Sequence, residues 1–189
     1  MELYNNFKSL FVSVWNKGIL GVDIIEILIG ILIFFVFLIF RGLISILIIK
    51  RLEGIAKKTT NKFDDTFVKA MQGPARFLPV VIGFFIASYY VTFSEDAREL
   101  VDTINRTLIT IFIFWVMHQI IEPISYILSG FDKILTRELI GWIIKSLKIL
   151  IFILGLAAVL ELWGIKIGPI IAGLGLFGVA VALGAQDLF

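Results

Sequence analysis

Long apolar runs, separated by short polar segments, are the dominant pattern along this chain. A helix needs about 20 apolar residues to cross the hydrocarbon core of a bilayer. Because the runs are continuous and do not alternate between polar and apolar positions, we expect helices and not barrel strands. Five transmembrane helices are predicted, at residues 22–49, 77–93, 107–128, 142–163 and 169–189. The expected fold class is an all-α integral membrane protein.

Two polar segments lie outside these spans. Residues 50–76 are polar and periodic, so they are predicted to form a cytoplasmic helical linker that ends where Gly73-Pro74 breaks the helix. In residues 1–21 the apolar positions recur at three- and four-residue spacing, which favours an amphipathic helix lying in the membrane interface. A frayed tail is the alternative. The same segment lacks the features of a signal peptide, and we expect it to remain attached.

The positions of lysine and arginine predict the orientation. They concentrate in the loops after the first and third spans, whereas the loop after the second span carries more acidic than basic residues. Cytoplasmic loops are enriched in lysine and arginine. The N-terminus is therefore expected outside the cell and the C-terminus in the cytoplasm.

Composition narrows the classes of function. Hydrophobic residues make up 59% of the chain and charged residues 17%, with a mean hydropathy of +1.01, which requires lipid as the solvent. The chain has no cysteine, so thiolate chemistry and disulfides are excluded. A net charge of +2 gives no reason to expect nucleic acid. With one histidine and no nucleophile, metal-ligand or phosphate-loop arrangement, we expect no enzyme, no cofactor and no metal.

The last span differs from the earlier ones, which are bulky throughout, because it is small on two faces. Close approach of helices is the reason to place small residues in a membrane helix. Two small faces predict two close neighbours, as in a ring of identical helices; ordinary packing in a non-conducting scaffold is the alternative. The small residues form two stripes, one with Gly175, Gly178, Ala182 and Ala185 and the other with Gly173, Ala180 and Gly184.

A third face of this span is apolar and bulkier. It carries Ala172, Leu176, Val179 and Leu183 at helical spacing and continues to Gln186. In a ring this face would line the axis, and stacked apolar rings at Val179 and Leu183 would form a gate that excludes water. Gly168-Pro169 is the predicted start of the helix.

The run AGLGLFGVAVALGAQDLF resembles the pore helix of the small-conductance mechanosensitive channel (MscS) family. The resemblance places Val179 and Leu183 on the two gate positions and Gln186 at the kink, with Asp187 where that family frequently has glycine. It implies a heptamer, two spans added before the usual three, and a cytosolic β-domain that would follow Phe189. We therefore expect the chain to be a fragment that lacks this domain.

The resemblance also implies a function. It is a channel opened by membrane tension, which relieves hypoosmotic pressure by weakly selective efflux of ions and small solutes. The expected partners are membrane lipids, further copies of the chain and inorganic ions as permeants. The expected location is the bacterial inner membrane.

Ionisable residues within the third span suggest an alternative function. His118 and Glu122 lie four residues apart on one helical face, where a proton-coupled secondary transporter would need a relay. An interhelical hydrogen-bonded pair with a structural role is the other interpretation.

Basic residues near the span ends are candidate lipid contacts. Arg41 is expected to snorkel, with a lipid headgroup, Asp23 or Glu26 as alternative partners. Arg137, Lys145 and Lys148 begin the fourth span and either bind anionic lipid phosphates or serve only as topology signals.

Overall fold

A computed structural model describes residues 23–56, 62–128 and 136–186. Within these ranges the chain forms helices and no strand. The predicted amphipathic helix at residues 1–21 lies outside the described residues, as does Asp187. The helices are α2 (Ile24–Ala56), α3 (Lys62–Tyr90), α4 (Glu95–Leu128), α5 (Arg137–Leu162) and α6 (Gly168–Ala185).

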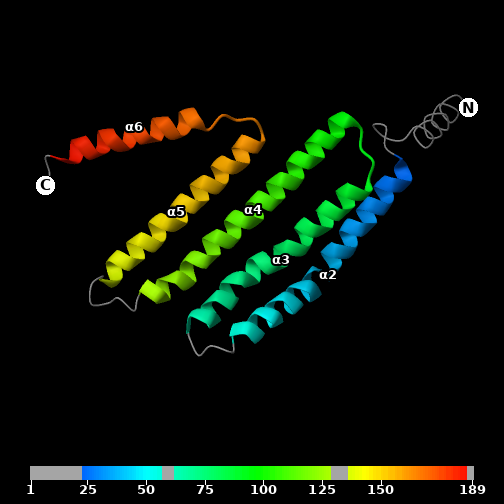
Figure 1. The fold of residues 1–189 in the computed structure, drawn as a ribbon, viewed down its shortest axis with the longest axis horizontal. Helices are drawn as coiled ribbons and strands as arrows, with labels where there is room; N and C mark the ends of the chain where they lie inside the picture. Colours follow the sequence, from blue (N-terminus) through cyan, green and yellow to red (C-terminus); the bar gives the residue numbers. More distant parts are fainter. Residues whose placement is uncertain (1–22, 57–61, 129–135, 187–189) are drawn as a thin grey trace, which may run out of the picture.

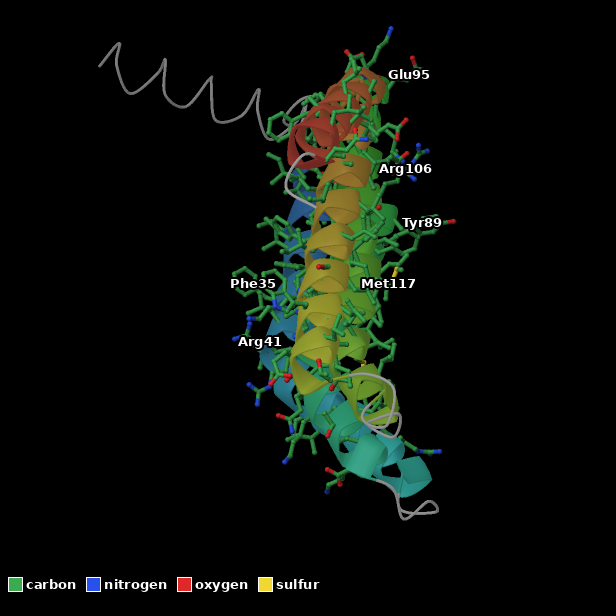
Figure 2. All side chains as sticks on the ribbon, turned by 90° about the vertical axis from the view of Figure 1, so that its left-hand side faces the viewer. Phe35, Arg41, Tyr89, Glu95, Arg106 and Met117 are labelled. Carbon is green, nitrogen blue, oxygen red and sulfur yellow. The ribbon has the colours of Figure 1, made fainter. Side chains whose placement is uncertain are left out.

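Helices α2 to α5 lie side by side in one layer, in chain order, with each helix antiparallel to the one before it (Figure 1). Seen edge-on, the layer has Phe35 on one face and Tyr89 on the other (Figure 2). Apolar side chains are exposed on all four helices because the layer is one helix thick. All four are long and apolar enough to cross a membrane. The chain is an integral membrane protein, and both faces of the layer require lipid or another protein as cover.

Helix α3 provides most of the small buried core. Its buried apolar residues include Val68, Met71, Ala75, Val81 and Ala87. They are buried because α2 packs on one side of α3 and α4 on the other. The membrane-spanning part of α3 is therefore covered by protein to a greater extent than that of any other candidate span in the described chain.

The predicted helix end at Gly73-Pro74 is wrong. Helix α3 continues through Pro74 and Pro79, so half of the predicted linker and most of the second predicted span form one helix. Each proline removes one backbone donor, which usually ends a helix. Both proline side chains are fully buried here, and packing against neighbouring helices allows a membrane helix to retain proline.

Each seam between neighbouring helices contains a glycine beneath an aromatic ring. A Cβ placed on Gly83 of α3 would lie 2.5 Å from Phe37 Cβ of α2. A Cβ on Gly155 of α5 would lie 2.9 Å from Phe114 of α4. Gly73 lies under Trp115 in the same way, at 3.1 Å. The early spans are thus not bulky throughout, and their few glycines set how closely the helices approach.

Polar contacts join α2, α3 and α4 near one end of the layer. Asn105 Nδ2 donates to Ser88 Oγ at 2.8 Å, and Ser88 Oγ donates to the Phe85 carbonyl at 2.9 Å. The Glu26 carboxylate accepts a hydrogen bond of 2.7 Å from Thr92 N, just after α3. Asn105 and Ser88 are buried, so their mutual hydrogen bond avoids the cost of an unpaired polar group. Helix α4 is therefore held firmly on its α3 side.

The Gly83 contact gives a test of this packing. Gly83→Ala should lower the free energy of unfolding by about 1–3 kcal/mol, because the added methyl group collides with Phe37 Cβ, which cannot move without its backbone. Unfolding in mixed detergent micelles measures this change. Gly54→Ala is the matched control, since a Cβ there meets no atom within 4 Å. Equal stability of the two variants would contradict the proposed role of the seam.

Candidate functional site

The candidate pore helix, α6, begins as the sequence predicts. Gly168 is its first residue and Pro169 lies in the first turn, where the missing N–H has no partner to lose. At the other end the backbone N–H of Gln186 donates to the Leu183 carbonyl. Helix α6 runs away from the layer, and it makes no extensive contact with α2 to α5 in the described part of the chain (Figure 1).

The described side chains of α6 are all exposed. Leu176 is 74% exposed and Leu183 63%, and these two share one helical face with Val179. Exposed apolar surface on this scale marks a contact with lipid or protein. The three predicted gate residues thus share one face, and no described residue of the chain buries them.

The small residues of α6 also lack neighbours. A Cβ placed on Gly173, Gly175, Gly178 or Gly184 would meet no atom within 4 Å outside the helix's own backbone. Ala180 and Ala182, the other predicted packing residues, are exposed as well. Glycine costs about 1 kcal/mol relative to alanine in a helix interior. At Gly73, Gly83 and Gly155 of the layer that cost is offset by close packing, whereas no described residue outside α6 packs against its glycines.

Three contacts along the α4–α5 seam support the helix that leads to α6. Lys148 Nζ of α5 lies 2.8 Å from Glu122 Oε2 of α4. Phe114 packs over Gly155 in the middle of the seam. At the far end Trp163 Nε1 donates to Thr107 Oγ1 at 3.1 Å. Helix α5 is therefore attached to α4 along most of its length.

A short turn connects this hairpin to α6. Trp163 caps α5, with its backbone N–H bonded to the carbonyls of Leu160 and Glu161. Gly164 then adopts a φ of 79°, a conformation that other residues rarely adopt. The direction of α6 thus depends on a turn that begins at the residue anchored to Thr107.

The structure does not join His118 to Glu122. The Glu122 carboxylate pairs with Lys148, whereas His118 lines a largely apolar groove of about 460 Å³ between α4 and α5, beside Trp115 and Gln119. No carboxylate lines this groove among the described residues. The relay that a proton-coupled transporter would need is therefore not supported. Glu122 does form an interhelical pair, but with a different partner from the one the spacing suggested.

Sequence reasoning missed both polar contacts between α4 and α5. Glu122 and Lys148 carry opposite charges at the same end of consecutive spans, and this was a signal for their ion pair. No comparable signal existed for Thr107 and Trp163, which are separated by 56 residues. Lys145 is exposed, and Arg137 is the first residue of α5. No group of three or more metal-ligating side chains occurs among the residues that the structure describes.

The ion pair between α4 and α5 can be tested with a double-mutant cycle. Lys148→Met leaves the Glu122 carboxylate unpaired at the edge of the membrane and should lower the free energy of unfolding by about 1 kcal/mol. Glu122→Gln combined with Lys148→Met should cost less than the sum of the single changes. Unfolding in mixed micelles measures the coupling, and strictly additive effects would mean that the pair contributes nothing.

Comparison with known proteins finds a match for the segment that contains α5 and α6. Residues 145–186, which contain most of α5 and all of α6, match the family described as "Mechanosensitive ion channel, transmembrane helices 2/3". No solved structure matches the chain.

Curated relatives extend the similarity over most of the chain. An uncharacterized MscS family protein of Aquifex aeolicus is 28% identical over 92% of this chain and 48% of its own length. The MscS family protein YhdY of Bacillus subtilis is 28% identical over 87% of this chain and 46% of its own. The small-conductance mechanosensitive channel MscMJ of Methanocaldococcus jannaschii is 29% identical over 91% and 51%. The chain spans about half the length of these relatives. The chain is thus similar to MscS family proteins over most of its length, and the similarity includes the exposed α6 and the helix that carries it.

Proposed function

We propose that copies of this chain assemble into a mechanosensitive ion channel in which α6 lines the pore. The observation that carries this proposal is the surface of α6, where a Cβ placed on Gly173, Gly175, Gly178 or Gly184 would meet no described atom within 4 Å outside the helix's own backbone. Identical helices around an axis would give each α6 two close neighbours, one for each small face. Similarity to MscS family proteins supports the same arrangement, and the resemblance implies seven subunits.

The gate in this proposal is the apolar face of α6. Leu176, Val179 and Leu183 would face the axis, and rings of Val179 and Leu183, about one helical turn apart, would exclude water from a narrow pore. An uncharged constriction discriminates little among ions. The open channel is therefore weakly selective and passes ions and small solutes under hypoosmotic stress.

The proposed topology places α6 as a fifth span, with the N-terminus outside and the C-terminus in the cytoplasm of a bacterial inner membrane. The charge pattern of the loops supports it. The acidic residues that begin α4 face outward, and the basic residues that begin α5 face the cytoplasm. Helix α6 then returns toward the cytoplasm with Gln186 and Asp187 in the kink region.

Tension would reach the gate through the layer. Stretching the bilayer favours the state that occupies more membrane area, and the lipid-exposed faces of α2 to α5 give tension a large surface on which to act. Because α5 is fastened to α4, tilting of the hairpin is transmitted through the Gly164 turn to α6. The small faces of adjacent α6 helices slide, and the ring of Leu183 side chains widens.

Patch-clamp recording under graded suction tests the proposal directly. The protein reconstituted in liposomes should give stepwise currents above a tension threshold, and empty liposomes should give none. Silence up to membrane rupture, with the protein shown to be inserted and oligomeric, would favour a non-conducting scaffold instead.

The gate assignment predicts a lower threshold for Leu183→Ser. The closed constriction would lose apolar contact worth about 1.5–3 kcal/mol per subunit and would hydrate more readily. Threshold tension and closed-state leak are the measurements. Phe177→Ser is the matched control, because Phe177 lies on a different face of the same helix and is equally exposed to its surroundings. A threshold unchanged in the Leu183 variant would remove that residue from the gate.

The ring assignment predicts that Gly178→Leu weakens assembly without affecting the fold of the subunit. No atom of the subunit lies within 4 Å of the position of the new side chain's Cβ, so helix content should be unchanged. Native mass spectrometry measures the oligomer. Gly141→Leu on α5 is the control, since its Cβ is equally free of contacts and the residue lies outside the small faces. If both variants formed the same oligomer as the unmodified protein, the result would argue against close α6–α6 packing.

A further inference from the structure

Helices α2 and α3 line an open groove of about 750 Å³, with both polar and apolar walls, toward the Gly54 end of the layer. We call it the α2–α3 groove. The polar residues that line it are Arg41, Ser45, Lys50, Glu53, Gln72 and Arg76. Apolar residues of α2, among them Ile39 and Ile46, complete the lining. Neither the gate nor the α4–α5 hairpin uses this groove.

The groove is positively charged. Three cationic side chains line it against the single carboxylate of Glu53. In the described part of the chain the ion pairs are Arg98–Asp102 and Lys148–Glu122, so Arg41, Lys50 and Arg76 are in none of them. The guanidinium groups of Arg41 and Arg76 come from different helices and share one groove. A planar guanidinium group can donate two parallel hydrogen bonds to the oxygens of a phosphate group.

The depth of the groove matches the edge of the hydrocarbon core. Arg41 lies about 26 Å along α2 from Ile24, and Lys50 lies about 39 Å from it, at 1.5 Å per residue. The hydrocarbon core is about 30 Å thick. With Ile24, the first residue of α2, taken as the opposite edge of the core, the groove extends from near the boundary of the core into the headgroup region. Arg41 projects from the same face of the layer as Phe35, which lies deeper (Figure 2).

We propose that the α2–α3 groove binds the phosphate of an anionic phospholipid, held between Arg41 and Arg76. Lys50 contributes further positive charge, Ser45 and Gln72 offer hydrogen bonds to the headgroup, and the acyl chains run along Ile39 and Phe35. A snorkelling Arg41 would need no partner from α3, whereas the groove gathers polar groups from both helices. The apolar part of the lining and the depth favour a lipid over a free phosphate ion. Such a lipid would bridge α2 and α3 in the proposed cytoplasmic leaflet.

Binding of added lipid to the delipidated protein tests this site. Native mass spectrometry of the whole protein, titrated with phosphatidylglycerol or phosphatidylcholine of identical acyl chains, should show preferential binding of phosphatidylglycerol. Arg41→Gln and Arg76→Gln should each weaken that binding about fivefold. Arg51→Gln is the matched control, because it removes the same charge from the same helix outside the groove, and it should bind as the unmodified protein does.

A steric variant keeps the charges and fills the space. A Cβ on Gly42, which lines the groove, meets no atom within 4 Å, so Gly42→Leu should fold normally and lose the lipid. Gly54→Leu, also free of contacts and outside the lining, should retain it. Circular dichroism verifies the fold of each variant.

Four outcomes would overturn the proposal. They are equal retention of the two lipids, unchanged phosphatidylglycerol binding in both arginine variants, unchanged binding in Gly42→Leu, and displacement of the lipid by millimolar inorganic phosphate. Because retention is measured without tension or current, failure here would leave the proposed channel function untouched.

Discussion

Close contact between glycine and aromatic rings is the interaction on which this layer of helices depends. Lipid tails are as apolar as the side chains that face them, so burial from water contributes little to helix association in a bilayer. Dispersion contacts and a few hydrogen bonds remain. Gly83 beneath Phe37, Gly73 beneath Trp115 and Gly155 beneath Phe114 provide one such contact at each seam. This explains how helices with such exposed apolar faces hold a fixed order.

The same principle explains why α6 stands apart from the layer. Within α2 to α5, the glycines at the seams have an aromatic or aliphatic side chain against them. Helix α6 has more glycine than any of these helices, and none of its described glycines has a neighbour. The contacts that hold α2 to α5 together do not involve the α6 surface. The proposed oligomer would supply packing partners for this surface from neighbouring subunits.

Much of the fold followed from the length of the apolar runs, because a bilayer imposes that length on any helix that crosses it. The start of α6 at Gly168-Pro169 was also predictable from local chemistry. Pro74 was misjudged because its penalty depends on whether neighbours enclose the helix, which the sequence does not show. Gly83 and Gly155 were overlooked for a related reason. A single glycine in a bulky span becomes informative only when the side chain above it is known.

The contacts that would transmit force could not be predicted, since they depend on the register between α4 and α5. Glu122–Lys148 and Thr107–Trp163 lie toward opposite ends of that seam, with Phe114 and Gly155 between them. Three contacts along one seam resist sliding of α5 past α4, so in the proposed channel the two helices would respond to a lateral force as one body. Helix α4 is in turn fixed to α3 through Asn105 and Ser88. The chain continues from α5 to α6 at Trp163, which is one of the residues that hold α5 against α4. In the proposed channel, motion of the layer would reach α6 through the Gly164 turn, where the backbone has a φ that few other residues adopt.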